Sequence, residues 1–494
     1  MSLKLVQFAD LCSENSLKSE KHILFVLSEK AENSLPFASE IENKLSRSQV
    51  EFKDLKSSPI TVELVSGALL SVVILGEQLS MFGKHNLLRK AVKPLLEEEP
   101  EKVTICVFGD DATREAHACA AYYVLSVNAA ELPSRKGAKS KQEKKHRPLQ
   151  EIAMYGHEAA HDYAYVNARV SANTLCRSLT MLPPNELTPT SYRAKVKELA
   201  MGKGWQLEEF DMPALKKMGA GAFYAVGQGS EPMDAAIVHL TYNPDPSHLT
   251  GATKHIALVG KGICFDTGGH NLKPAKYMQY MHEDMNGSAV ALSILHAVTE
   301  LKWPVKIDCW LAIAQNHIGP LAYKQNDVVT ALNGLTIEIV HTDAEGRMVL
   351  ADTLTLASRQ KPDFILDFAT LTGDMAVAVT DRMSGVICNR PELACKAVGA
   401  GIAAGERIVA FPYEEDMDCD LESDIADILQ CTLDAEGDHL LAARFMGKFI
   451  ENDVAWVHTD LSSTNRKDGL GAVESTVNGF GVGFGLELVK ALIA

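Results

Sequence analysis

Two carboxylates separated by a single residue, Asp343 and Glu345, lie in a short acidic turn that ends in Arg347. A β-like run, residues 335–340, precedes the turn, and a helix-like run, residues 348–357, follows it. Open α/β sheets keep their functional groups at the carboxyl ends of strands, where such a turn lies. Carboxylates this close on a non-helical turn can converge on one cation from two directions. Asp and Glu are also favoured in the first turn of a helix, so the turn by itself is equally well explained as a cap.

Two further segments carry charged groups in comparable places. A strand-like run, residues 255–260, leads into a glycine-containing segment with Lys261, Asp266 and Lys273, which we expect to lie on the loop after that strand. Asp284 lies just before an apolar helix-like run. The segment after residue 260 lacks the order of glycine, lysine and Ser/Thr that defines a P-loop, so its pattern does not indicate phosphate binding.

The carboxylates of these segments would repel one another if they gathered without a cation, and their pKa values would rise. Two divalent metals about 3.5–4 Å apart resolve such repulsion and bridge a nucleophilic water. Lys261 can ligate a metal only as the neutral amine, which requires a strongly lowered pKa that nearby cations can impose. The sequence therefore predicts a carboxylate-rich site for two metals, formed by Asp266, Asp284, Asp343 and Glu345.

A second candidate metal site is the His-Glu-x-x-His pattern of His157, Glu158 and His161. On a helix, this pattern places two zinc-binding imidazoles on one face beside a general-base Glu. Gly156 directly precedes the motif, no strong apolar helix surrounds it, and the sequence offers no assignable third ligand. A mononuclear zinc endopeptidase is the resulting alternative, and it predicts that His157→Ala, rather than Asp343→Ala, abolishes activity.

The hydrophobic pattern supplies an α/β framework for these groups. Strand-like and helical runs alternate over residues 1–150, which predicts a small N-terminal α/β domain. A helical linker is expected over residues 151–185, and the prolines at its end break the helix. A larger α/β alternation fills residues 186–494, the predicted catalytic domain, with a central mixed sheet flanked by helices. The strands expected in the two domains are residues 22–28, 68–75, 102–108, 255–260, 305–313 and 364–368.

Composition excludes several classes of partner. The formal net charge of −16 argues against nucleic acid or an anionic membrane, and the basic segment 135–147 is interpreted as a solvated connection. The ten cysteines contain no Cys-x-x-Cys pair, which favours reduced thiols. With no signal-peptide pattern and no apolar run of transmembrane length, we expect a cytoplasmic protein that does not enter the membrane.

Several ordered blocks resemble the signature segments of the leucyl aminopeptidases (cytosol aminopeptidases, peptidase family M17). These blocks are residues 259–262, 265–269, 284–285, 342–347 and 369–373. The resemblance extends from about Leu182 to Gly485 and covers the larger domain, whereas the first domain matches only in general character.

The resemblance implies an enzyme that hydrolyses the N-terminal residue, leucine-like by preference, from peptide substrates. Two divalent ions, zinc or manganese with magnesium or cobalt also possible, would be held by Lys261, Asp266, Asp284, Asp343 and Glu345, with Asp266 and Glu345 bridging both. The nucleophile would be a water that bridges the two metals. A homohexamer with the larger domains at its centre is also implied.

Four more residues receive roles from the resemblance. Lys273 would polarise the scissile carbonyl and stabilise the oxyanion. Arg347 would hold a bicarbonate that acts as general base, and Met281 and Thr370 would line the pocket for the first side chain.

The chain departs from the family pattern at His341, His282, Glu283 and Arg444, which put substrate preference and metal affinity in question. The imidazole of His341 is expected to be a tolerated neighbour of Asp343, and the alternative is that it adds a hydrogen bond or a weak ligand. Two other readings stay open: a non-enzymatic assembly or regulatory protein on this fold, which predicts no bound metal after purification, and a two-metal phosphoesterase, which requires a basic phosphate-binding surround.

Overall fold

The computed structural model describes residues 3–29, 35–137, 148–248, 253–433 and 436–494. Its contacts divide the chain into two compact units, residues 1–170 with 467–478 and residues 171–466 with 479–494. Most of the basic segment predicted as a connection, 135–147, lies outside the described residues. No helix in the described part of the chain is long and apolar enough to cross a membrane.

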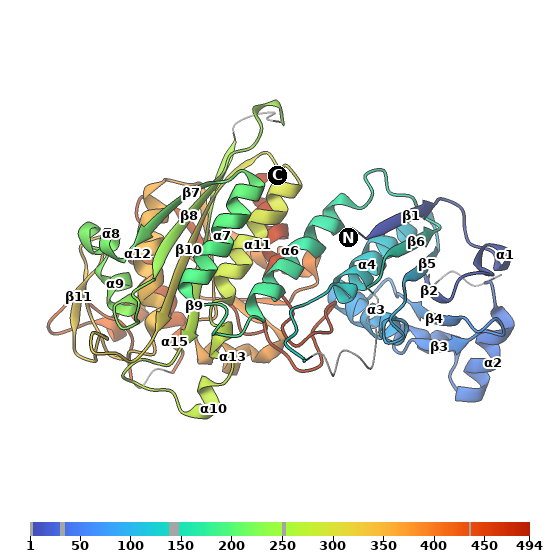
Figure 1. The fold of residues 1–494 in the computed structure, drawn as a ribbon, viewed down its shortest axis with the longest axis horizontal. Coiled ribbons are helices and arrows are strands. Elements are labelled where there is room, and N and C mark those ends of the chain that lie inside the picture. Colours follow the sequence, from blue (N-terminus) through green and yellow to red (C-terminus); the bar gives the residue numbers. More distant parts are fainter. Residues whose placement is uncertain (1–2, 30–34, 138–147, 249–252, 434–435) are drawn as a thin grey trace. The chain divides into compact units, whose positions relative to one another are not determined.

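The first unit is built on a six-stranded sheet with strand order β1-β6-β5-β2-β4-β3 (Figure 1). All neighbouring strands run parallel except β3, which pairs antiparallel with β4. The apolar runs predicted as strands are its central members, and their side chains are buried on both faces, as expected for a parallel sheet. The strands are β1 (Lys4–Phe8), β2 (His22–Leu27), β3 (Ile60–Glu63), β4 (Leu69–Ile74), β5 (Lys102–Phe108) and β6 (Glu151–Tyr155).

Helical segments separate most of these strands along the chain, in keeping with the alternation expected from the sequence. They are α1 (Glu14–Leu17), α2 (Ala38–Ser48), η1 (Phe52–Lys56), α3 (Met81–Leu96) and α4 (Asp111–Ala129). The predicted helical linker over residues 151–185 is wrong at its start, because residues 151–155 form β6 between β1 and β5. The helix itself, α6 (Ala164–Thr180), begins later and crosses the division between the two units.

The second unit contains an eight-stranded mixed sheet with strand order β15-β14-β17-β13-β9-β10-β8-β7. The central strands β17, β13, β9 and β10 are parallel, so their carboxyl ends lie at one edge of the sheet. Strand β14 is antiparallel to β17, and β8 is antiparallel to both β10 and β7. The strands are β7 (Gln206–Asp211), β8 (Ala236–Tyr242), β9 (Lys254–Asp266), β10 (Val305–Asn316), β13 (Phe364–Ala369), β14 (Ser384–Cys388), β15 (Ile408–Phe411) and β17 (Ala455–Asp460).

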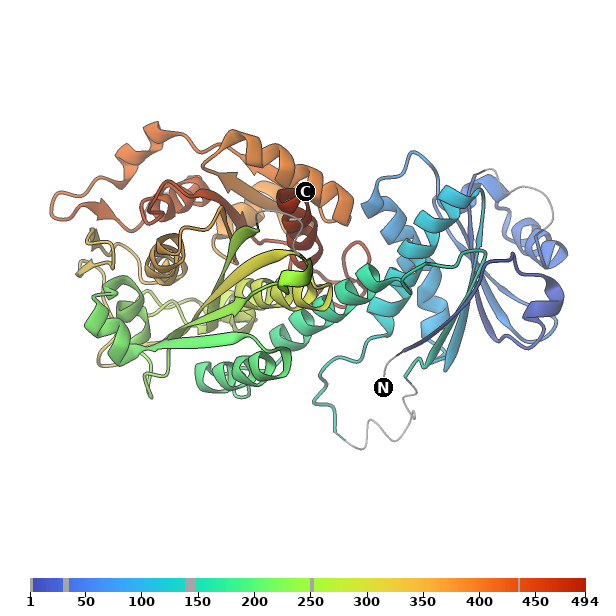
Figure 2. The same ribbon diagram turned by 90° about the horizontal axis from the view of Figure 1, so that it is seen from above.

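Helices cover both faces of this sheet (Figures 1 and 2). Helices α7 and α11 pack on one face, and α12 packs on the other beside α9. Both α11 and α12 are buried over nearly their whole length, which explains why they lack a strong polar face. The helices are α7 (Pro189–Lys203), α8 (Met212–Met218), α9 (Gly221–Gly227), η2 (Pro246–His248), α10 (Ala275–Met278), η3 (Met281–Glu283), α11 (Asn286–Glu300), α12 (Glu345–Arg359), α13 (Gly373–Val379), η4 (Thr380–Arg382), α14 (Pro391–Ala404), η5 (Glu415–Leu421), α15 (Asp438–Gly447) and α16 (Val482–Ile493).

Strand β9 is longer than predicted, so Lys261 and Asp266 lie in the strand and not on the loop after it. The strand continues because it stays paired with β10 as far as Asp266 opposite Asn316. Glycine at position 260 lets α11 approach closely, since a Cβ there would lie 2.4 Å from Ser288 Cα. Lys261 and Asp266 are thereby held by the backbone pairing of the sheet itself.

The strand before the acidic turn belongs to a different sheet from the one expected. Strand β12 (Thr336–Glu338) lies in a small three-stranded sheet with β11 (Val328–Thr330) and β16 (Ile428–Leu429). Asp343 and Glu345 therefore do not follow a strand of the eight-stranded sheet. They reach its edge because α12, which begins at Glu345, packs against β9 and β10.

Candidate metal centre

Carboxylates from three separate segments converge at the edge of the eight-stranded sheet. Asp266 ends β9, Asp343 lies in the turn after β12, and Glu345 begins α12. One oxygen of each lies within 4.8 Å of the others, and no other group of three such side chains occurs in the described residues. Asp284, between η3 and α11, joins them through Lys261. The structure thus brings together the four carboxylates that the sequence singled out.

Two lysines lie between these carboxylates. Lys261 Nζ lies 3.0 Å from Asp284 Oδ1 and 2.9 Å from Glu345 Oε1. It also donates to Thr370 O at 3.0 Å. The backbone of α12 comes so close to this amine that a Cβ at Gly346 would lie 2.6 Å from Lys261 Nζ, so a larger residue there would displace the amine from its place between the carboxylates.

The second lysine, Lys273, lies on the segment after β9. Its Nζ contacts Asp266 Oδ2 at 2.8 Å and Asp343 Oδ1 at 2.5 Å. Each lysine therefore joins two carboxylates from different segments.

The four carboxylates carry more negative charge than the two lysines neutralise. Burial and the charges of Asp266 and Glu345 raise the pKa of Asp343 to about 7, even though Lys273 acts to lower it. Burial likewise raises the pKa of Asp284 and of Glu345. Burial disfavours the charge on Lys261, but Asp284 and Glu345 raise its pKa above the ordinary value. Because these carboxylates repel one another, an additional cation would stabilise their ionised forms.

The residues fit a divalent cation. Carboxylate oxygens are hard donors that suit magnesium and manganese, and zinc also accepts them. Asp284 Oδ2 is buried and has no hydrogen-bond partner among the described side chains and backbone, which leaves one oxygen of this residue free to bind an ion. Lys261 is ion-paired in this arrangement, so its ligation of a metal requires loss of its proton.

Asn316, at the end of β10, holds this arrangement together and was missed in the sequence. Its Nδ2 donates to Asp266 Oδ1 at 2.8 Å and to Thr342 O at 3.0 Å, and it lies 3.4 Å from Glu345 Oε2. Asn316 could have been selected from the sequence because it is a polar residue at the carboxyl end of a buried strand. Asn316 fixes the relative positions of two strand ends and the acidic turn.

The acidic turn is shaped by its own hydrogen bonds. Thr342 Oγ1 donates to Gly268 O at 2.6 Å, and Thr342 N donates to Asn271 Oδ1 at 2.9 Å. Tyr323 donates its hydroxyl to Thr342 O at 2.8 Å. The bonds to Gly268 and Asn271 join the turn to the segment after β9, and the bond from Tyr323 joins it to the segment after β10. Asp343 is thereby held next to Lys273.

Arg347, to which the family resemblance assigned a bicarbonate, lies in the first turn of α12 and is buried. Its Nη2 donates to Asp438 Oδ2 at 2.6 Å, and its Nη1 donates to Gln430 O at 3.2 Å. Asp438 was not selected from the sequence, although it directly follows a glycine at a helix start. The guanidinium therefore already has a carboxylate partner within the chain.

The two residues assigned to the substrate pocket differ in their contacts. Thr370 follows β13, and its Oγ1 donates to Asp284 Oδ1 at 2.7 Å, so it orients a carboxylate of the cluster. Met281 begins η3 and is half-buried. Both lie in segments that adjoin Asp284.

The departures from the family pattern have separate structural consequences. His341 Nδ1 accepts a hydrogen bond from Asp343 N at 3.2 Å, so its imidazole supports the acidic turn. Arg444 in α15 instead forms two hydrogen bonds with Asp418, at 2.6 and 2.8 Å, and lies over the ring of Tyr413. Glu283 accepts two hydrogen bonds from Asn465.

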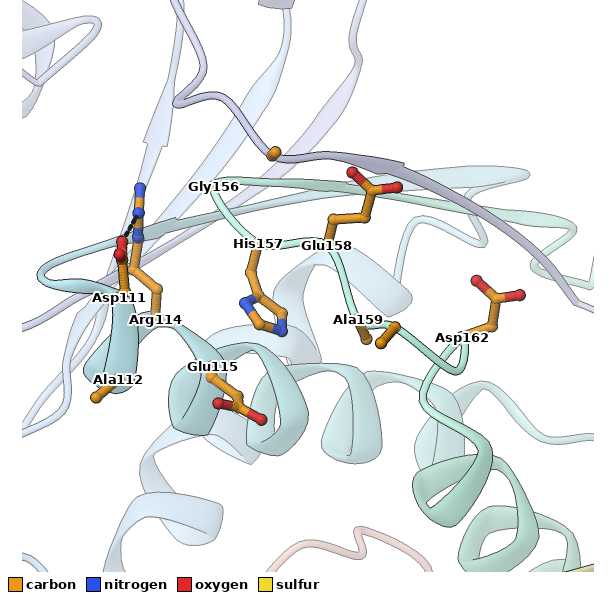
Figure 3. Close-up of a pocket in the computed structure, with 11 residues that line it drawn as sticks. Asp111, Ala112, Arg114, Glu115, Gly156, His157, Glu158, Ala159 and Asp162 are labelled. Carbon is orange, nitrogen blue, oxygen red and sulfur yellow. Dashed lines mark hydrogen bonds and ion pairs between the residues drawn. The ribbon is translucent and has the colours of Figure 1, made fainter.

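The His-Glu-x-x-His pattern does not lie on a helix. Residues 157–161 form a loop and turn between β6 and α6, so His157 and His161 do not share a helical face. His157 lines a hollow of about 640 Å³ in the first unit, and Glu158 points away from His157 (Figure 3). The structure therefore gives no support to a zinc endopeptidase built on this motif.

Comparisons with known proteins agree with the geometry. A model of the catalytic domain of the cytosol aminopeptidase family matches residues 174–485. A probable cytosol aminopeptidase of Pseudomonas fluorescens is 40% identical over 324 residues, which cover 64% of this chain and 64% of that protein. One from Nitrobacter winogradskyi is 36% identical over 335 residues, 67% of this chain and 64% of that protein. The matched region thus spans about 64% of the length of these relatives.

Solved structures resemble nearly the whole chain. The bottromycin maturation enzyme BotP in complex with manganese superposes with a TM-score of 0.83 at 26% identity, covering 95% of this chain and 99% of that one. A mutant of tomato leucine aminopeptidase also gives a TM-score of 0.83, at 24% identity, covering 99% and 97% of the two chains. The second likeness bears on the fold alone, and it includes the predicted arrangement of an N-terminal domain and a larger α/β domain.

Proposed function

Because the chain belongs to the cytosol aminopeptidase family, we propose that it is a metal-dependent aminopeptidase that removes N-terminal residues from peptides, leucine-like ones by preference. The convergence of the carboxylates of Asp266, Asp343 and Glu345 carries this proposal. Such a cluster, joined by Lys261 and Lys273, has the donor chemistry of a hydrolytic metal site.

Two divalent ions per chain are proposed. Lys261, Asp266, Asp284 and Glu345 would hold one ion, and Asp266, Asp343 and Glu345 would hold the other. When bound, such ions polarise a carbonyl oxygen and lower the pKa of water. Manganese and zinc are the favoured candidates, with magnesium or cobalt as replacements, because oxygen-rich sites accept all of them. The manganese complex of BotP supports manganese as the first ion to test.

Protein groups around the ions have distinct proposed roles. Lys273 is close to two carboxylates and charged, so it can donate to the carbonyl oxygen of the substrate and to the oxyanion that forms from it. Met281 and Thr370 are proposed to border the site of the first side chain. A bicarbonate at Arg347 would have to compete with Asp438, which lies 2.6 Å from the same guanidinium.

The assembly and the compartment are also proposals. A homohexamer and a cytoplasmic location rest on the resemblance to the family, whose matched relatives are named cytosol aminopeptidases. Ten free cysteines fit a reducing compartment. Light scattering coupled to size-exclusion chromatography tests the hexamer directly, and a mass of one or two chains would contradict it.

Metal content and turnover, measured on the same samples, test the proposed activity. We expect about two metals per chain by elemental analysis and hydrolysis of leucyl amides and leucyl peptides by the wild type. Asp343→Ala should lose both metal and turnover, because one ligand and one partner of Lys273 disappear. His157→Ala, in the first unit, is the matched control and should keep both.

Three results would contradict the proposal. Loss of activity in His157→Ala with retention in Asp343→Ala would restore the zinc endopeptidase. Full metal occupancy without hydrolysis of any aminoacyl amide or peptide would indicate a non-enzymatic protein. Turnover of phosphate esters in place of peptides would indicate a two-metal phosphoesterase.

A further inference from the structure

Asp460, the last residue of β17, is a buried carboxylate that organises a loop of the sheet edge. Its Oδ1 accepts hydrogen bonds from Leu371 N at 3.0 Å and Thr372 N at 3.3 Å, and its Oδ2 accepts one from the Thr372 hydroxyl at 2.6 Å. Such donors compensate a buried carboxylate for its lost hydration. All three belong to the 370–372 loop, which joins β13 to α13, so Asp460 fixes the shape of this loop.

The 370–372 loop starts next to the segment that carries Asp284. Strand β13 pairs parallel with β17, and Ala369, its last residue, lies opposite Asp460. The start of α11 packs closely on the end of β13, since a Cβ at Gly287 would lie 2.1 Å from Phe368 O. Asp284 directly precedes α11 by two residues, so the loop and this carboxylate meet at the same edge of the sheet.

Thr370, the first residue of the loop, contacts two proposed metal ligands with its two oxygens. Its carbonyl oxygen accepts from Lys261 Nζ at 3.0 Å, and its hydroxyl donates to Asp284 Oδ1 at 2.7 Å. An amine that binds an ion through its lone pair keeps two N–H groups, so the carbonyl of Thr370 can still accept one of them. The hydroxyl occupies Oδ1 of Asp284 and leaves Oδ2, which is buried and without a hydrogen-bond partner in the described part of the chain, to face an ion. One residue thus orients both side chains.

The two side chains that Thr370 contacts are assigned to one ion alone, because the other ligands of that ion are proposed to bridge both ions. Asp343, which is assigned only to the second ion, is held by different groups. Its backbone N–H donates to His341 Nδ1 at 3.2 Å, and its carboxylate contacts Lys273 Nζ at 2.5 Å. Both partners lie outside the 370–372 loop, so support that passes through this loop reaches the first ion and not the second.

We propose that Asp460 is a positioning residue for the ion that Lys261 and Asp284 bind. It acts through the 370–372 loop, because the loop in its fixed shape lets Thr370 hold the amine and the carboxylate at one spacing. Without Asp460 the three donors of the loop lose their buried acceptor, and the loop shifts to satisfy them elsewhere. This inference rests on the proposed aminopeptidase with two ions, and it gives Asp460 a selective effect on one of the two.

Titration of metal-stripped protein with manganese, against a competing chelator, tests the inference because it gives a dissociation constant for each ion. Asp284→Ala identifies the relevant ion as the one whose binding step disappears. Asp460→Asn keeps the side-chain volume but replaces one acceptor oxygen with an amide donor. It should weaken the step that Asp284→Ala removes by roughly 10–100-fold, the usual cost of losing a residue that supports a metal ligand. The other step should be unchanged.

A second pair of variants tests the same point if Asp460→Asn folds poorly. Thr372→Val removes the hydroxyl that donates to Asp460 Oδ2 and should weaken the same step, whereas Thr372→Ser keeps a hydroxyl and should restore wild-type binding of both ions. Asp352→Asn is the matched control, since Asp352 is a buried carboxylate on α12 that accepts from Phe223 N and Leu332 N, each at 2.8 Å. It should lower the midpoint of urea unfolding and leave both dissociation constants unchanged.

The inference is overturned if Asp460→Asn and Thr372→Val leave both dissociation constants unchanged, or if they weaken both ions equally. The same loss of affinity in Asp352→Asn would also overturn it, because a general loss of stability would then explain the effect. A wild type that binds a single ion would overturn the two-ion site and this inference with it. A selective effect on one ion in a protein that hydrolyses no peptide would instead refute the proposed function and support the role of Asp460.

Discussion

Asn316→Ala removes an amide that holds the carboxylate cluster in shape. Asn316 Nδ2 contacts Asp266 Oδ1 at 2.8 Å and Glu345 Oε2 at 3.4 Å, so one buried group orients both proposed bridging residues. Hydrogen bonds to charged groups contribute about 1.5–3 kcal/mol each. Loss of such a supporting residue lowers metal affinity roughly 10–100-fold, which corresponds to about 1.4–2.7 kcal/mol at 1.36 kcal/mol per tenfold change. We expect Asn316→Ala to weaken metal binding by that amount.

The matched control is Asn389→Ala. Asn389 also links two strands, because it donates to Val454 O at 2.9 Å and accepts from Trp456 N at 2.7 Å. It lies at the end of β14, which is antiparallel to β17 and therefore ends at the opposite edge of the sheet from Asn316. Its removal should lower stability without changing metal affinity.

Both quantities are measurable on metal-stripped protein. Titration with manganese in the presence of a competing chelator gives the dissociation constant, and urea unfolding of the metal-free variants gives the change in stability. A dissociation constant for Asn316→Ala within twofold of wild type would refute the reasoning. An equal loss of affinity in Asn389→Ala would refute it too, because the effect would then be a general loss of stability.

Three further results are expected. Lys273→Met should lower kcat by about 10²–10³-fold, the usual cost of removing an oxyanion donor, with little change in KM; unchanged kcat in steady-state assays would contradict its role. Burial opposes ionisation of Asp308, yet hydrogen bonds from His239 and His255 lower its pKa. A lowered folded pKa gives stability that is present above the unfolded pKa of about 4 and is lost as pH falls below it. Asp308→Asn should therefore be less stable than wild type by about 1–3 kcal/mol at pH 7, and urea midpoints should show the difference shrinking toward pH 3. Arg444→Ala should lower Tm but keep kcat, since its contacts lie away from the cluster; a loss of turnover in the folded variant would contradict this.

The sequence was sufficient for the local elements and for the identity of the charged groups. Apolar runs such as residues 22–28 and 102–108 have the length and composition of buried parallel strands, and both form as predicted. Asp343 and Glu345 are separated by one residue, and Asp284 lies just before a helix, so their local positions follow from nearby residues alone. These features depend on residues that are close together in the sequence, so they can be predicted without knowledge of the fold.

Long-range pairing was not readable from the chain. Residues 151–155 form β6, which pairs with β1 on one side and β5 on the other. Strand β12, which precedes the acidic turn, lies in a separate three-stranded sheet. In both cases the strand's own residues are compatible with several partners, and the packing of the whole unit selects one. The domain boundary and the sheet to which β12 belongs could therefore be identified only from the tertiary structure.

The supporting residues of the site were also decided by the fold. Asn316 and Asp438 belong to elements that are distant from the acidic turn in sequence, and neither forms part of a recognisable pattern with it. The family resemblance implied a bicarbonate at Arg347, and the fold places the carboxylate of Asp438, which lies 91 residues further along the chain, beside the same guanidinium. Residue types thus specified which charges are present, while the packing of α12, α15 and β10 decided which of them meet, because ion pairs and hydrogen bonds depend on distances that only the folded chain sets.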